Sequence, residues 1–118
     1  MTSIKINPVA ARYASSLLDI AAEKKKVETI EKDMNDLGAT IEGSEDLQRL
    51  LGNPLISKKQ KMDVVSAIAK KGKLDKITTN FLCVLVDNGR LNALDDIVVA
   101  FRRELPTRRG EIEASVTN

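Results

Sequence analysis

The residue types that usually perform enzyme chemistry are sparse in this sequence of 118 residues, which contains no histidine and one cysteine, Cys83. Histidine is the commonest general base and a frequent metal ligand, so its absence removes the usual activator of a serine nucleophile. Ser15, Ser16 and Ser66 therefore lack the partner that would make them reactive. Cys83 stands in the apolar run 81–86, where the role of a small hydrophobic residue on a helix is favoured.

Phosphate-binding and acid–base motifs are also missing from the sequence. The pair Gly72-Lys73 has no second glycine five residues upstream, and no predicted strand precedes it, so it does not form a phosphate-binding loop. Asp95 and Asp96 are adjacent acids on the polar side of a predicted helix, where solvation is favoured over catalysis. We therefore expect no catalytic residue, no metal site and no bound cofactor.

Short basic clusters raise the question of a nucleic-acid partner. They lie at 24–26, 58–61, 70–73, 102–103 and 108–109, and they are interleaved with acids. The net charge is only +2, from 19 basic and 17 acidic residues. Aromatic residues make up 3% of the chain, so the stacking platforms of single-strand binders are scarce. We expect no nucleic-acid partner, but a helical RNA-binding module stays open as the alternative function.

Apolar residues recur with helical spacing from about residue 8 to residue 105, which predicts an all-α, six-helix bundle. Asn7 followed by Pro8 is a typical helix start, and Ser57 with Gln60 is a capping box. The Asn88-Gly89 pair predicts a left-handed helix end before Asn92 caps the sixth helix. The predicted helices span about 8–26, 27–42, 44–52, 57–72, 75–88 and 92–105.

The pattern changes after Pro106, which is expected to end or kink the sixth helix. Residues 111–117 alternate between polar and apolar side chains, which predicts one β-strand. A single strand has no partner, so we assign 1–106 to a six-helix N-terminal domain. Residues 107–118 are then a linker and the first strand of a C-terminal domain that the sequence does not include. No apolar stretch approaches the ~20 residues of a membrane span, so we expect no direct membrane insertion.

The first and fifth helices have apolar faces wider than one core requires. Polar residues cover only about 100° of the first helix, between Arg12 and Glu23. The fifth helix is similarly apolar around the run 81–86. Two interpretations remain open. Either both helices are simply central in the bundle, or each buries one flank and offers the other as the wall of a groove for an amphipathic partner helix.

Helical geometry divides these two faces into predicted groove walls and predicted core. Leu82, Leu85 and Val86 point away from the predicted groove and are expected in the core. The candidate groove residues are Val9, Tyr13, Ser16, Leu17 and Ile20 on the first helix and Ile77, Asn80 and Val84 on the fifth.

Four segments of the sequence carry a family resemblance: residues 12–21 (RYASSLLDIA), residues 80–91 (NFLCVLVDNGRL), Asn53-Pro54 and Arg109-Gly110-Glu111. Together they resemble the ATP synthase delta subunit family, which includes the mitochondrial oligomycin-sensitivity-conferring protein. Residues 12–21 are similar to the opening helix of that family, and residues 80–91 resemble its run of asparagine and apolar residues that ends in acid-Asn-Gly-Arg-Leu. The two shorter segments match the family in order and spacing, and the resemblance covers nearly the whole chain.

The resemblance implies a non-catalytic stator subunit of the proton-translocating F-type ATP synthase. It implies that the groove between the first and fifth helices binds the N-terminal helix of an alpha subunit in the catalytic head. The family's C-terminal domain would bind the b subunit of the peripheral stalk. An initiating Met1 without a transit peptide favours a peripheral location on the cytoplasmic face of a bacterial inner membrane. The alternative is the matrix face of the mitochondrial inner membrane.

Overall fold

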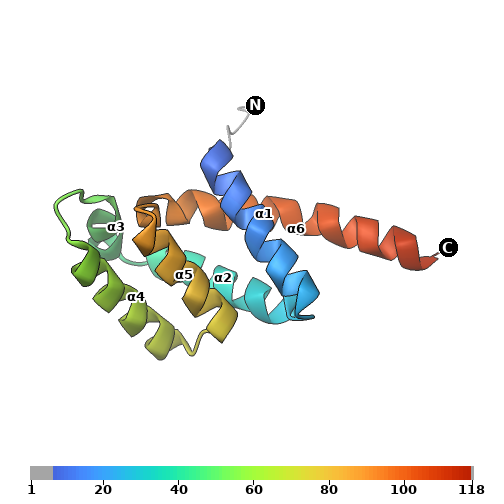
Figure 1. The fold of residues 1–118 in the computed structure, drawn as a ribbon, viewed down its shortest axis with the longest axis horizontal. Helices are drawn as coiled ribbons and strands as arrows, with labels where there is room; N and C mark the ends of the chain where they lie inside the picture. Colours follow the sequence, from blue (N-terminus) through green and yellow to red (C-terminus); the bar gives the residue numbers. More distant parts are fainter. Residues whose placement is uncertain (1–6, 118) are drawn as a thin grey trace.

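The computed structural model describes the backbone of residues 7–117 and the side chains of residues 7–108. Over these residues the chain is all-α, as the hydrophobic periodicity predicts (Figure 1). The helices are α1 (Pro8–Glu23), α2 (Val27–Glu42), α3 (Glu45–Gly52), α4 (Lys58–Gly72), α5 (Lys76–Asp87), a short 3-10 helix η1 (Leu91–Ala93) and α6 (Leu94–Thr117).

Local capping determines where most of these helices begin. The Asn7 side chain accepts a hydrogen bond from the backbone N–H of Val9, so the predicted start of α1 is confirmed. The capping box of α4 is also confirmed, because Ser57 and Gln60 each accept a hydrogen bond from the other's backbone N–H. At the far end of α4, Lys73 adopts the left-handed conformation, with φ of 52°, in place of the neighbouring glycine.

The connection between α5 and α6 differs in part from the sequence prediction. Gly89 has φ of +69°, which confirms the left-handed turn predicted there. The backbone N–H of Arg90 donates to the carbonyl of Leu85 across this turn, at 2.7 Å. Asn92 is not an N-cap, however, because it lies inside the 3-10 helix η1 that leads directly into α6.

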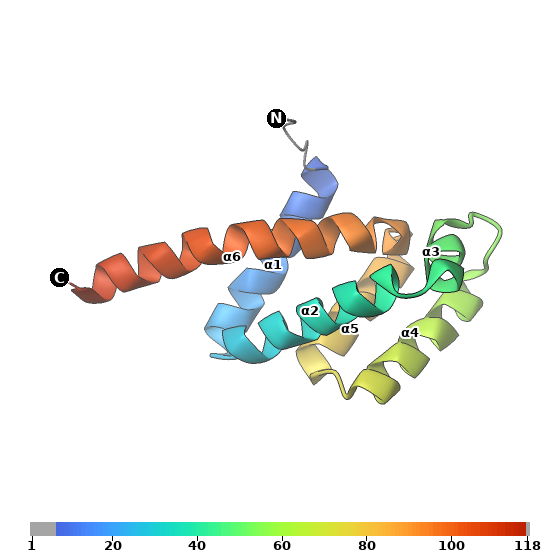
Figure 2. The same cartoon turned by 180° about the vertical axis from the view of Figure 1, so that it is seen from behind.

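One hydrophobic core unites the helices. α1 packs mainly against α6, and α2 lies beside α6 when the molecule is seen from behind (Figure 2). α4 and α5 form a second pair beside them (Figure 1). The largest fully buried side chains come from α1, α2, α5, η1 and α6, and include Leu17, Met34, Leu85 and Phe101. Leu82, Leu85 and Val86 are all buried, as predicted.

A buried polar cluster fixes the start of α5 against α2. Asp33 is 4% exposed, and its carboxylate accepts 2.8 Å hydrogen bonds from the backbone N–H of Asp75 and the hydroxyl of Thr78. These bonds replace the water that the carboxylate loses on burial. α5 therefore begins at a position that α2 determines.

The predicted strand at 111–117 is wrong, because α6 continues through Pro106 to Thr117 as a helix. An unpaired strand leaves its backbone N–H and C=O groups without partners, whereas a helix pairs them within the segment. Proline removes only one such bond, so it does not force the helix to end here. The last turns of α6 extend beyond the other helices (Figure 1).

Candidate functional site: an apolar groove between α1 and α5

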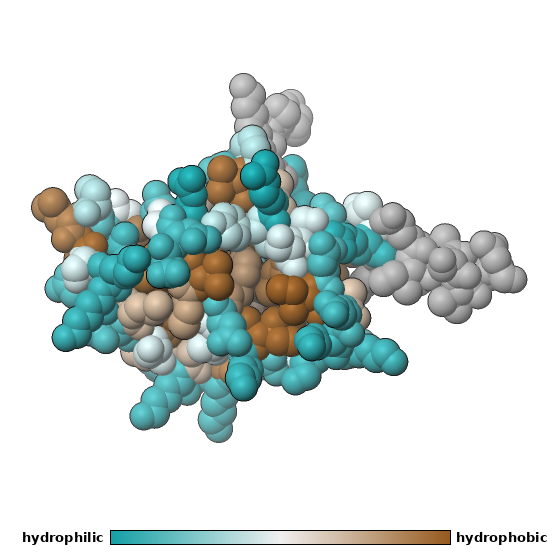
Figure 3. Space-filling view, viewed as in Figure 1, coloured by the Kyte–Doolittle hydropathy of each residue, from teal (hydrophilic) through white to brown (hydrophobic). Residues whose placement is uncertain are grey.

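An open groove of about 410 Å³ lies between α1 and α5. In the space-filling view the surface over this groove is apolar and is bordered by polar side chains (Figure 3). The groove is lined by Tyr13, Ser16, Ile20 and Lys24 from α1 and by Ile77, Asn80, Phe81 and Val84 from α5. The four α1 residues follow one another at intervals of three or four positions, so they lie on one helix face, about one turn apart.

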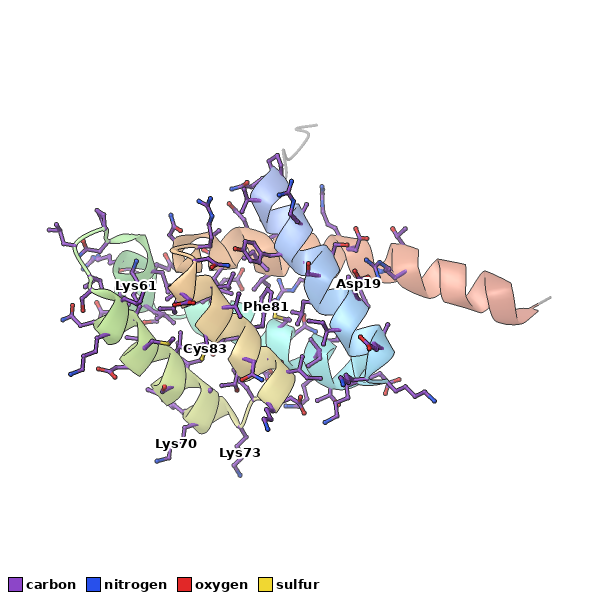
Figure 4. The ribbon with its side chains drawn as sticks, viewed as in Figure 1. Asp19, Lys61, Lys70, Lys73, Phe81 and Cys83 are labelled. Carbon is purple, nitrogen blue, oxygen red and sulfur yellow. The ribbon has the colours of Figure 1, made fainter. Side chains whose placement is uncertain are left out.

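Side-chain contacts between the two walls set their separation at one end. The ring of Tyr13 meets the ring of Phe81 edge-on, with centroids 6.2 Å apart and an interplanar angle of 73°. The Tyr13 hydroxyl also accepts a 2.9 Å hydrogen bond from the Asn88 side-chain amide. Figure 4 shows Phe81 on the side of α5 that faces α1, whereas Cys83 lies on the side towards α4. These two contacts of Tyr13, with Phe81 and with Asn88, join α1 directly to α5 at this end of the groove.

A second contact holds the opposite end of the groove, where α5 begins. The Asp75 carboxylate caps α5 by accepting from the backbone N–H of Ile77, and it forms a 3.0 Å ion pair with Lys26 in the α1–α2 connection. The backbone hydrogen bond from Ile77 and the contact with Lys26 lower the pKa of Asp75 below its usual 3.8. The first residues of the α5 wall are therefore fixed to the chain that leaves α1.

Two large apolar side chains in this groove are exposed to solvent. Ile20 on α1 is 41% exposed, and Val84 on α5 is 47% exposed. Single exposed apolar residues are ordinary on protein surfaces, but these two line the same depression from opposite walls. Leu85, one position after Val84, is completely buried. The wide apolar face of α5 thus divides into a core flank and a solvent-facing flank, as one of the two sequence interpretations requires.

The structure brings together most of the candidate groove residues but not all of them. Tyr13, Ser16, Ile20, Ile77, Asn80 and Val84 line the groove. Leu17 does not, because it is fully buried in the core. Val9 is half-buried and lies outside the lining. Sequence reasoning missed Lys24 and Phe81, and a search for side chains on the helix faces of Ile20 and Ile77 would have found both.

The residues that sequence analysis weighed for chemistry occupy structural or solvated positions. Ser15 accepts a 2.8 Å hydrogen bond from Arg108, which also pairs with Asp19 at 2.7 Å and so holds α6 on α1. Asp95 and Asp96 are exposed on α6, and desolvation, followed by repulsion from Asp96 and Glu42, raises the pKa of Asp95. Over the described residues, no group of three or more His, Cys, Asp or Glu is arranged to hold a metal ion.

The aromatic residues give little support to the RNA-binding alternative. Phe81 and Phe101 are buried, and Tyr13 is half-buried against Phe81. No ring therefore stands as an open platform for a base. Lys61, Lys70 and Lys73 lie along and beyond α4, away from the groove (Figure 4).

Within the described part of the chain, no helix is both long and apolar enough to cross a membrane.

Comparison with known proteins identifies a family for this chain. The family model for the ATP synthase delta (OSCP) subunit matches residues 9–118. The chain is 41% identical over 117 residues to ATP synthase subunit delta of Brucella ovis, covering 99% of this chain and 63% of that protein. It is 41% identical over 115 residues to the Brucella anthropi subunit delta, covering 98% of this chain and 62% of that protein. The chain thus spans less than two-thirds of the length of these relatives.

Solved structures repeat the arrangement of helices. A chain of the Toxoplasma gondii mitochondrial ATP synthase hexamer matches 80% of this chain and 53% of its own length, with a TM-score of 0.75 and 30% identity. A chain of the Polytomella F-ATP synthase, in the F1 head and rotor, matches 90% of this chain and 93% of its own length. Its TM-score is 0.76 at 19% identity, so this second likeness concerns the fold alone.

Proposed function

Because the chain belongs to the ATP synthase delta (OSCP) subunit family, we propose that it acts as a non-catalytic stator subunit of a proton-translocating F-type ATP synthase. In this role it helps to hold the catalytic head still while the central rotor turns. The torque of the rotor then drives ATP synthesis. Without a stator, the head would rotate together with the rotor. The subunit transmits force between proteins and catalyses no step.

The partner of the groove is the N-terminal helix of a head alpha subunit. The observation that carries this assignment is the exposure of Ile20 and Val84 on facing walls, where an amphipathic helix would remove both from water. The α1 wall from Tyr13 to Lys24 is about three helical turns, or about 16 Å, long. A partner helix of three to four turns, with apolar residues at helical spacing, matches this length.

The second contact of a stator subunit is with the b subunit of the peripheral stalk. We assign it to the part of the relatives' length that this chain does not span. The complete subunit would then be peripheral, on the cytoplasmic face of the inner membrane, as befits relatives from Brucella. The matrix face of the mitochondrial inner membrane is the corresponding place for an organellar protein.

The groove assignment is tested by titrating the isotope-labelled chain with the N-terminal peptide of the alpha subunit from the same organism. Amide shifts should concentrate on Tyr13, Ser16, Ile20, Ile77 and Val84. The control peptide carries serine in place of its apolar face and should cause no shifts. Shifts that cluster on α2 or α6, or no binding by the native peptide, would show that the groove does not receive this partner.

A further inference from the structure

One lining residue of the groove carries a charge. Lys24 ends α1 as its C-cap, one turn beyond Ile20, at the end of the groove where Ile77 begins the α5 wall. The other lining side chains are apolar, aromatic or uncharged polar. The groove is therefore chemically different at its two ends, with a tyrosine hydroxyl near one and an ammonium group at the other.

The ammonium of Lys24 has no carboxylate partner within the described residues. The acid at the start of α5, Asp75, already forms a 3.0 Å ion pair with Lys26 and accepts a hydrogen bond from the backbone N–H of Ile77. Lys24 is exposed in the free chain, where water solvates its charge. A helix that covers Ile20 and Ile77 would remove part of that water, so a docked partner needs to supply a negative group there.

We propose that the groove selects an amphipathic helix that carries an aspartate or glutamate opposite Lys24. This inference rests on the proposed function, because it takes the occupant to be the alpha-subunit helix. The acid lies about one turn beyond the partner residue that covers Ile20, since Lys24 itself lies one turn beyond Ile20. Its pairing with Lys24 fixes which end of the partner helix meets which end of the groove. The apolar walls supply most of the affinity, and Lys24 supplies register and orientation.

The test measures the affinity of the alpha-subunit N-terminal peptide for Lys24→Gln, Lys24→Glu and a matched control, Lys70→Glu. Lys70 is an exposed lysine in the last turn of α4 that does not line the groove, so its reversal has a similar effect on a helix end. At low salt we expect about 2–5-fold weaker binding for Lys24→Gln and about 10-fold for Lys24→Glu. Both losses should shrink at high salt, and the control should bind like the wild type.

Reversing the partner's charge completes the test. The peptide acid that faces Lys24, once changed to lysine, should restore binding to Lys24→Glu, and a zero-length carbodiimide should couple Lys24 to that acid in the wild-type complex. If the peptide binds all variants equally, the inference about Lys24 is wrong while the groove assignment survives. If the wild-type chain does not bind the peptide at all, the proposed function itself fails.

Discussion

Replacing Val84 or its neighbour Leu85 with aspartate separates a groove wall from the core at adjacent positions. Val84 is 47% exposed, so its replacement by aspartate removes only a partly buried apolar side chain. The substitution also adds a negative charge to the last turn of α5. We expect a stability loss of about 1–2 kcal/mol from these effects. Leu85 is completely buried, so its replacement combines a cavity of about 3–5 kcal/mol with a desolvated charge. That sum approaches the whole stability of a typical domain.

Thermal melting and peptide titration of the same variants measure the two effects. Val84→Asp should stay folded, with its melting temperature lowered by roughly 3–6 °C per kcal/mol of stability lost, and should bind the alpha-subunit peptide about 100-fold more weakly. Leu85→Asp should not fold. The matched control is Val99→Asp, because Val99 is 39% exposed on α6 and does not line the groove.

The variants refute the reasoning in two distinct ways. If Val84→Asp unfolds the chain as completely as Leu85→Asp, Val84 belongs to the core, and the wide apolar face of α5 only marks a central helix. If Val84→Asp binds as well as Val99→Asp, the groove is not the peptide site. Only a folded, non-binding Val84 variant beside a folded, binding Val99 variant supports the proposal.

Three further substitutions test the polar contacts that hold α1 against α5 and α6. Tyr13→Phe should lower the free energy of unfolding by about 1 kcal/mol in chemical denaturation, because it removes the hydroxyl that accepts a hydrogen bond from Asn88. It should weaken peptide binding less than tenfold. An unchanged free energy of unfolding would show that this hydrogen bond does not stabilise the fold. Arg108→Gln should lower the melting temperature more at low salt than at high salt, because it breaks the ion pairs with Asp19 and Glu104. Equal losses at both salt concentrations would contradict an electrostatic origin. Asp75→Asn should reduce stability at neutral pH, because the folded chain lowers the pKa of Asp75 and so favours its ionised carboxylate. This difference from wild type should shrink as the pH falls below 3.8 and vanish below the lower pKa of the folded chain. A constant difference would argue against the ionised carboxylate.

The parts of the fold that follow from neighbouring residues are the parts the sequence predicts best. The caps at Asn7 and Ser57 involve hydrogen bonds over two or three positions, so their signature is visible in a short window. The buried stripe of α2, from Ile30 to Ile41, follows from helical spacing in the same way. By contrast, Asp33 bonds to groups 42 and 45 positions away, and nothing near it in sequence indicates that a polar residue of α2 would be buried.

The groove itself could be predicted only in outline. The width of the apolar faces indicates that α1 and α5 have a flank to spare, but the position of α6 decides which flank. α6 packs along α1, and Leu17 is fully buried in the shared core, so that residue belongs to the core and not to the predicted groove. Lys24 was not among the predicted groove residues because these were chosen along the apolar faces, although Lys24 lies one turn beyond Ile20 on the same helix face.

The strand prediction fails for a related reason. Alternation between polar and apolar residues indicates a β-strand only where a neighbouring strand can pair with its backbone. Residues 111–117 have no such partner here, and the helix that continues from Leu94 satisfies the backbone within itself. The assignment of residues 107–118 to a linker and a second domain stays a prediction.

The two polar contacts at the ends of the groove explain how its apolar walls can stay apart. Apolar side chains as exposed as Ile20 and Val84 would gain by closing on one another, because burial from water is favourable at about 25 cal/mol per Å². Tyr13 with Asn88 at one end, and Asp75 with Lys26 at the other, fix the α1 side relative to the α5 side, and the Tyr13 ring packs edge-on against Phe81 between them. The groove is thereby preorganised, so a partner helix does not need to open it and less of the interaction energy is lost in ordering the site.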